Sequence, residues 1–282
     1  MEKNPLLNIV RQPKIYIKLP SQGKFWPEGS LSHSINGEYP VYSMTAKDEL
    51  LLKTPDALLN GQAVVEVIQH CMPNILNAWY IPSLDLEAIL IAIRLATFGE
   101  SFDLDIDLGV EEKFTYTLDL RVLLDTINQT INWDPVVEID NQMVCYVRPL
   151  YYKEMTESSL EIFETQRIIT MLSNDSLSQE QKIETFRESF KKLSEINIQL
   201  INSVVYKIES TVGTVENVDF IREFLEECDS SIFNKIKNHL DVMKKNNTMK
   251  PLTIATTDEQ RAKGLADTVE VPLTFDQSSF FG

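Results

Sequence analysis

The segment AILIAIRLA, residues 88–96, places the strongest constraint on how this chain can fold. It suits a helix that is capped at Ser83 and ends at Gly99, and nearly every side of that helix is apolar. A helix without a polar face must be enclosed by other elements. We therefore expect a central buried helix here. The chain has 282 residues, 43% of them hydrophobic, so it can supply the surrounding core.

Two short strands and a capped helix are expected before this segment. Residues 14–19 are rich in β-branched and aromatic side chains and predict a first strand, and Tyr39–Met44 predict a second. Thr45 is a suitable N-cap for a leucine-rich helix, and Asp48 in its first turn favours the helix dipole. The N-terminal region is therefore expected to mix strands and helices.

The block KTPDALLNG, residues 53–61, contains two helix boundaries. Its Thr-Pro-Asp start is expected to cap a short helix, because proline is favoured in a first helical turn. The Asn60-Gly61 step is expected to end that helix. Apolar residues at helical spacing then predict another helix over residues 62–72.

Residues 102–120 alternate apolar and polar side chains and predict a β-hairpin that turns at residues 109–112. Asp103, Asp105 and Asp107 share the polar face of this hairpin, in a spacing that matches the opening of a calcium loop. The glycine and the bidentate glutamate of such a loop are missing from the register. A solvated strand face is the better interpretation, and no metal site is expected.

The second half of the chain has helical patterns. Residues 122–125 are expected to begin a short helix, and paired strands are expected at 135–139 and 141–148. Helices are then predicted at 158–172, 178–211 and 219–245. Apolar residues spaced alternately three and four apart give the second of these a coiled-coil-like stripe: Ile183, Phe186, Phe190, Leu193, Leu200 and Val204, with Asn197 in the seam. The stripe packs either on Leu160, Phe163 and Ile168 of the same chain or on a partner or second copy.

These elements together predict an α+β protein. An N-terminal mixed helix/β-hairpin domain is expected at residues 1–152 and a long-helix region, either a helical hairpin or coiled-coil-like, at 153–250. The tail at 251–282 alternates as a strand and is expected to pack back on the N-terminal domain.

The charge balance narrows the choice of partners. The formal net charge is −16, which argues against nucleic acid and against anionic membranes, because both bind clustered Lys and Arg. The three cysteines are widely spaced and form no C-x-x-C pair, so we expect buried free thiols in a reducing compartment. The sequence has no apolar run of membrane-spanning length and no secretory signal pattern, so we expect action in the cytosol where the protein is made.

No catalytic pattern stands out in the sequence. His70 and Cys71 are adjacent, but neighbouring residues of a helix point in different directions, so a surface imidazole and a core thiol are the better interpretation. There is no P-loop, no G-x-G-x-x-G and no G-x-S-x-G. We therefore expect neither an enzyme nor a cofactor.

Five segments give the chain a resemblance to a known family. They are LPSQGKFWP, YPVYSMTAKDELLLKTPDALLNG, VIQHCMP, the helix end AIRLATFG, and the tail VPLTFDQSSFF. With these segments the chain resembles the baseplate hub and hub-assembly proteins of T4-like contractile-tailed phages. The resemblance covers most of residues 15–125 and the last dozen residues. Many relatives look like they carry a C-x-x-C zinc ribbon where this chain has DLGVEEKF, so a zinc role does not carry over.

The resemblance implies a non-enzymatic protein that helps to build the hub of a contractile-tail baseplate. It implies either a hub subunit of the virion or a transient assembly chaperone that is absent from the mature particle, acting in the host cytoplasm. The implied partners are other hub proteins and the tail tape-measure protein, with self-association through the helical region as a further interaction. The implied protein-binding residues are Phe25, Trp26, Lys53, Thr54, Pro55, Asp56, Asn60, Gly61, Phe280 and Phe281.

Overall fold

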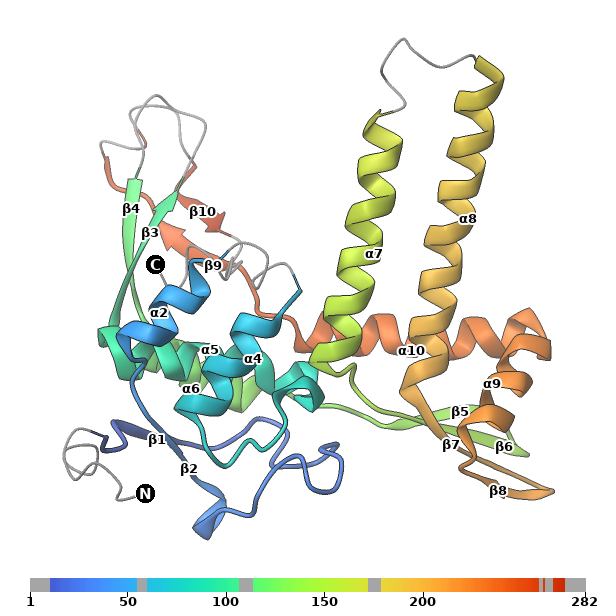
Figure 1. The fold of residues 1–282 in the computed structure, drawn as a ribbon, viewed down its shortest axis with the longest axis horizontal. Helices are drawn as coiled ribbons and strands as arrows, with labels where there is room; N and C mark the ends of the chain where they lie inside the picture. The colour runs from blue at the N-terminus through green and yellow to red at the C-terminus, as the bar shows by residue number, and fades with distance from the viewer. Residues whose placement is uncertain are drawn as a thin grey trace, which may run out of the picture.

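The computed structural model describes residues 11–54, 60–106, 114–171, 179–258, 261 and 266–271. It is a mixed α/β fold in which helices α7 and α8 extend away from a body of shorter helices and small sheets (Figure 1). This confirms the mixed class that the sequence predicts.

Helix α5 (Ser83–Phe98) is the centre of the N-terminal core, as its composition predicts. Its residues Ala88, Ile89, Ile91, Ala92 and Ile93 are fully buried. Ser83 is the first helical residue and Pro82 is the N-cap, so the predicted cap is wrong by one position. The amide of Ser83 instead donates to the carbonyl of Leu150, which ties the start of α5 to the segment just before helix α7 (Tyr152–Met171).

The elements around α5 follow the expected order. Strands β1 (Ile15–Ile17) and β2 (Tyr39–Val41) pair antiparallel, and η1 (Ile35–Gly37) lies between them. Helices α2 (Ala46–Leu52), α4 (Gln62–Cys71), η2 (Ala78–Tyr80) and α6 (Leu120–Thr130) supply the rest of the enclosure. Helix α6 begins two residues before the start predicted at residue 122, because Asp119 caps it with two side-chain hydrogen bonds. Its apolar face joins the core.

The predicted hairpin is present as β3 (Ser101–Ile106) and β4 (Phe114–Asp119), which pair antiparallel in one register. Its turn, with Asp107, Glu111 and Glu112, lies outside the described residues. On the polar face, the Thr117 hydroxyl donates to Asp103 across the strands at 2.6 Å.

A second core is built on a four-stranded sheet in the order β5-β6-β7-β8. The strands are β5 (Val136–Asp140), β6 (Met143–Val147), β7 (Val205–Ser210) and β8 (Gly213–Val215). The pairing of β6 with β7 crosses the domain boundary expected near residue 152, and that boundary stays a prediction. Helices α9 (Val218–Glu227) and α10 (Ser230–Asn247) cover the sheet with Ile221, Leu225 and Ile236.

Two helix predictions are wrong in this region. The helix predicted over 178–211 ends at Val204, and residues 205–210 continue as β7 because they complete the sheet beside β6. The helix predicted over 219–245 is two helices, because Cys228 is extended and Asp229 starts a new one. Helix α10 continues to Asn247, two residues beyond the predicted helix end at 245.

Helices α7 (Tyr152–Met171) and α8 (Gln179–Val204) lie side by side (Figure 1). Helix α7 begins earlier than the predicted residue 158. Thr165 of α7 and Ser189 and Ile196 of α8 are buried, as is Val204 at the end of the predicted stripe. Ile183, Phe186 and Phe190 of that stripe are exposed. The distal part of the predicted stripe is therefore not the contact between the two helices.

The tail contributes a small antiparallel sheet of β9 (Leu252–Ala255) and β10 (Thr268–Val271). Met249 and Leu252 pack against the N-terminal core. Residues 272–282, which include Phe280 and Phe281, lie outside the described residues.

Candidate functional site

The end of the KTPDALLNG block lies directly against helix α7. Gly61 has a φ of +75°, and a Cβ atom there would come within 3.0–3.2 Å of Thr156 and Tyr152. Both the backbone angle and the close approach therefore require glycine at this position. Gly61 is the N-cap of α4, and the Asn60 side chain accepts a hydrogen bond from the Gln62 amide at 3.0 Å.

The beginning of the same block is fixed by α2. Lys53 is the C-cap of α2, and the Thr54 hydroxyl donates to the Leu50 carbonyl at 3.4 Å. Pro55 and Asp56, with the short helix expected there, lie outside the described residues. Among the residues of this block that are predicted to bind a partner, Asn60 lines a pocket.

That pocket has a volume of about 340 Å³ and lies between η2, the end of the block and α7. Two aromatic residues line it: Trp79, which stacks on the buried Tyr152 with ring centroids 5.8 Å apart, and the exposed Tyr80. Its lining residues are Asn60, Asn77, Trp79, Tyr80, Lys153, Thr156, Glu157 and Leu160. Aromatic faces rimmed by amides, hydroxyls and one ion pair suit the docking of a protein segment. We call this pocket the α7 groove.

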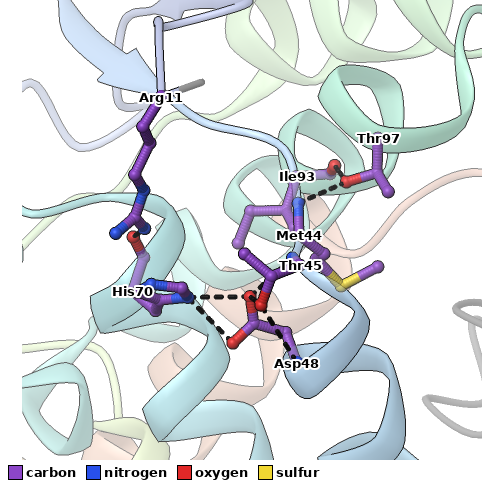
Figure 2. Close-up of polar contacts among 7 residues, drawn as sticks. All are labelled: Arg11, Met44, Thr45, Asp48, His70, Ile93 and Thr97. Atoms are coloured by element: carbon purple, nitrogen blue, oxygen red, sulfur yellow. Dashed lines mark hydrogen bonds and ion pairs between the residues drawn. The ribbon is translucent and has the colours of Figure 1, made fainter. Parts of the chain in front are cut away.

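The α2–α4 pair is held together at Asp48 (Figure 2). Asp48 accepts hydrogen bonds from the Thr45 amide at 2.7 Å and from His70 Nδ1 at 2.7 Å, and the Thr45 hydroxyl caps the Asp48 amide in return. Burial acts to raise the pKa of Asp48, but the hydrogen bonds from Thr45 and the contact with His70 outweigh it and keep this pKa below its usual value. The predicted N-cap at Thr45 is confirmed.

The start of this unit is also anchored to the central helix. The Met44 amide donates to the Thr97 hydroxyl at 3.0 Å, which itself donates to the Ile93 carbonyl (Figure 2). Arg11 reaches the His70 carbonyl from the chain before β1. These contacts fix the position of α2, which directly precedes the block KTPDALLNG.

His70 and Cys71 do not form a nucleophile–base pair. Nδ1 of His70 points at Asp48, and Cys71 is fully buried, which raises the pKa of its thiol to about 12. A thiol held protonated in this way is a poor nucleophile. The core thiol is confirmed, whereas the predicted surface imidazole is partly buried against Asp48.

Thiol labelling tests this environment. Burial also raises the pKa of Cys145 to about 11, whereas Cys228 is only partly buried. In the native protein at pH 8 we expect iodoacetamide to modify Cys228 at least tenfold faster than Cys71 or Cys145, because a thiolate must form and be reached. Mass spectrometry of tryptic peptides measures the rates, with the urea-unfolded chain as control. Equally fast labelling of Cys71 in the native protein would contradict its burial.

The aromatic residues of LPSQGKFWP lie in a strained loop that Asp85 holds. The carboxylate of Asp85 is fully buried and accepts from the Ser21 amide at 2.7 Å, the Ser21 hydroxyl at 2.5 Å and the indole of Trp26 at 2.7 Å. Gln22 and Phe25 both have positive φ, which costs free energy for residues other than glycine. The hydrogen bonds to Asp85 offset this strain.

Phe25 connects the loop to the second core. Its ring packs edge-on against Trp133 at 6.5 Å, and its carbonyl accepts from the Tyr151 hydroxyl at 3.0 Å. Both predicted aromatic residues therefore have structural contacts within the chain, and Phe25 and Trp26 each remain partly exposed.

Arg148 ties together the base of the α7–α8 pair. Its guanidinium makes two hydrogen bonds to Glu154 at the start of α7, at 2.6 and 2.9 Å, and one to the Ser203 carbonyl at the end of α8, at 2.8 Å. It also lies 3.8 Å from the centre of the Tyr151 ring. Planar bidentate pairing of this kind fixes the orientation of the two side chains, Arg148 and Glu154, as well as the distance between them.

Sequence reasoning missed three contributors to these sites: Asp85, Arg148, and the pair Trp79–Tyr152. A signal existed for Asp85, because an acid inside an almost wholly apolar helix needs buried donors. The other two depend on contacts between distant segments.

The described residues contain no group of three or more His, Cys, Asp or Glu side chains placed to hold a metal ion. Within the same residues, no helix combines the length and the apolar character needed to cross a membrane.

The chain belongs to the T4 bacteriophage base plate protein family, whose model matches residues 12–269. This confirms the resemblance at the level of the T4-like baseplate proteins and gives the protein a structural role in a phage tail baseplate, where it contacts other tail proteins. No curated protein and no solved structure gave a significant match to the chain.

Proposed function

We propose that the protein is a subunit of the baseplate hub that acts by binding other tail proteins while the hub forms. The observation that supports this proposal is the family match, which spans both cores and the α7–α8 pair instead of one motif. The role is non-enzymatic, since docking surfaces are enough for it.

The α7 groove is the proposed contact. It combines Asn60, at the end of the block KTPDALLNG, with aromatic residues of η2 and polar residues of α7. Gly61 fixes the distance between the block and α7, so the family motif shapes the groove. The other proposed binding residues are Phe25, Trp26, Lys53, Thr54, Pro55, Asp56, Phe280 and Phe281. The proposed partners are other hub proteins and the tail tape-measure protein, met in the host cytoplasm.

A transient assembly chaperone, absent from the mature virion, is the second candidate. The strongly acidic chain and the exposed apolar side chains of α8 favour it, because both suit a protein that shields an assembly intermediate.

A mass-spectrometric inventory of purified particles, alongside a tagged pulldown from infected cells, separates the two candidates. We expect the protein in the particle at a fixed ratio to the other baseplate proteins. Absence from the particle, with hub or tape-measure proteins in the pulldown, would instead establish the chaperone. If neither signal is found, the hub proposal is wrong.

A further inference from the structure

Helix α8 carries an exposed apolar stripe along its distal half. Ile183, Phe186 and Phe190 lie three and four residues apart, hence on one face, and their side chains are 60%, 48% and 53% exposed. The rings of Phe186 and Phe190 lie 4.7 Å apart. Helix α7 does not cover these three side chains. It meets this part of α8 on a different face, the one on which Ser189 is buried. We call these three residues the α8 stripe.

Basic residues border the α8 stripe. At about 100° per residue, Lys182 lies on the edge of the stripe nearer α7, seven residues before the buried Ser189. Arg187 and Lys191 lie on the other edge, which they share with Glu180 and Glu184. The remaining glutamates of this part of the helix, Glu188 and Glu195, point away from the stripe. On a chain with a net charge of −16, an apolar surface bordered by three cations and two acids stands out from its surroundings.

From this arrangement we infer that the α8 stripe docks an acidic amphipathic helix of a partner protein. Such a helix buries apolar residues at i, i+3 and i+7 against Ile183, Phe186 and Phe190, and its flanking Asp and Glu meet Lys182, Arg187 and Lys191. The present ion pairs of Arg187 with Glu184 and Lys191 with Glu195 are exposed and weak, so the cations can exchange partners. The inference rests on the proposed binding function and names the kind of partner.

A second copy of the chain fits this surface poorly. In an antiparallel pair centred on the two phenylalanines, Arg187 would face the second copy's Arg187. In a parallel pair, Lys182 would face the second copy's Arg187. Like charges at these edges destabilise a helix pair, whereas acidic flanks on a different protein remove the conflict.

The test uses the full-length protein and two synthetic helical peptides. Both peptides have about 18 residues, about five turns, and leucines at i, i+3 and i+7. One has Glu at the flanking positions and the other has Lys. Fluorescence anisotropy measures binding, and we expect the Glu peptide to bind at least tenfold more tightly than the Lys peptide. The double variant Phe186→Gln/Phe190→Gln should lose at least tenfold of that affinity.

A matched control and a charge swap complete the design. Phe163→Gln removes an equally exposed phenylalanine, 55% exposed, from α7 and should leave binding unchanged. Lys182→Glu/Arg187→Glu/Lys191→Glu should reverse the preference towards the Lys peptide. Equal binding of both peptides, or an unchanged affinity of the Phe186/Phe190 variant, would overturn the inference. So would sedimentation showing that the wild type dimerises through these phenylalanines. The particle inventory does not depend on these outcomes, so the proposed function is judged separately.

Discussion

Replacing Asp85 by alanine is expected to lower the free energy of unfolding by about 3–5 kcal/mol. The change leaves the Ser21 amide, the Ser21 hydroxyl and the Trp26 indole without their acceptor in a dry environment. It also releases the strained loop that contains Gln22 and Phe25. The contact of Phe25 with Trp133 links this loop to the second core. Urea unfolding followed by tryptophan fluorescence measures the effect.

The pH dependence of this loss has a definite sign. Burial raises the pKa of Asp85 to about 6, against 3.8 for an exposed aspartate. The native state therefore holds a proton between about pH 4 and 6 that the unfolded chain releases, so the contribution of Asp85 to stability falls as pH rises through 6. The loss caused by Asp85→Ala should be about 2 kcal/mol larger at pH 4.5 than at pH 7.5.

Asp103→Ala is the matched control. Asp103 accepts one hydrogen bond on the exposed face of the β3–β4 hairpin. Its replacement should change stability by no more than about 0.5 kcal/mol at either pH. A loss for Asp85→Ala that is identical at both pH values would show that this carboxyl does not change its protonation state in the native protein.

Replacing Arg148 by methionine is expected to lower the free energy of unfolding by about 2–4 kcal/mol. Glu154 would keep its charge in a site where its side chain is only 20% exposed, and the Ser203 carbonyl would lose its donor. Because these contacts join β6 to the start of α7 and the end of α8, amide hydrogen exchange should speed up first at the base of the helix pair.

Two further variants make the Arg148 prediction specific. Arg148→Met/Glu154→Met should recover part of the loss, because no unpaired charge remains. Arg222→Met removes an exposed pair with Asp219 and should cost no more than about 0.5 kcal/mol. If Arg148→Met were as mild as Arg222→Met, the base of the helix pair would be held by apolar packing alone.

Local patterns predicted the elements of this fold well where the segment itself decides the outcome. The apolar run of α5 gives the central helix, the alternation at residues 101–119 gives the β3–β4 hairpin, and Thr45 with Asp48 gives a capping box. In each case the signal lies within one turn or one strand pair, so propensity and periodicity are enough.

The same reasoning failed where a distant segment decides the outcome. Residues 205–210 continue a helical pattern, yet they form β7 because β6 offers them an unpaired edge. The stripe at Ile183, Phe186 and Phe190 has coiled-coil spacing, yet α7 meets α8 at Ser189. Periodicity identifies an apolar face but does not say which element covers it.

The sequence alone determined the mixed class, the buried central helix, the acidic surface and the family, because composition and motif residues are properties of the chain itself. Only the tertiary structure decided how Asp85 holds the Ser21–Trp26 loop, how Gly61 shapes the α7 groove and how Arg148 fixes the helix pair. Each of these contacts joins residues that are 55 to 95 positions apart along the chain or links separate elements. Burial and hydrogen-bond geometry between such segments exist only once the two cores have packed.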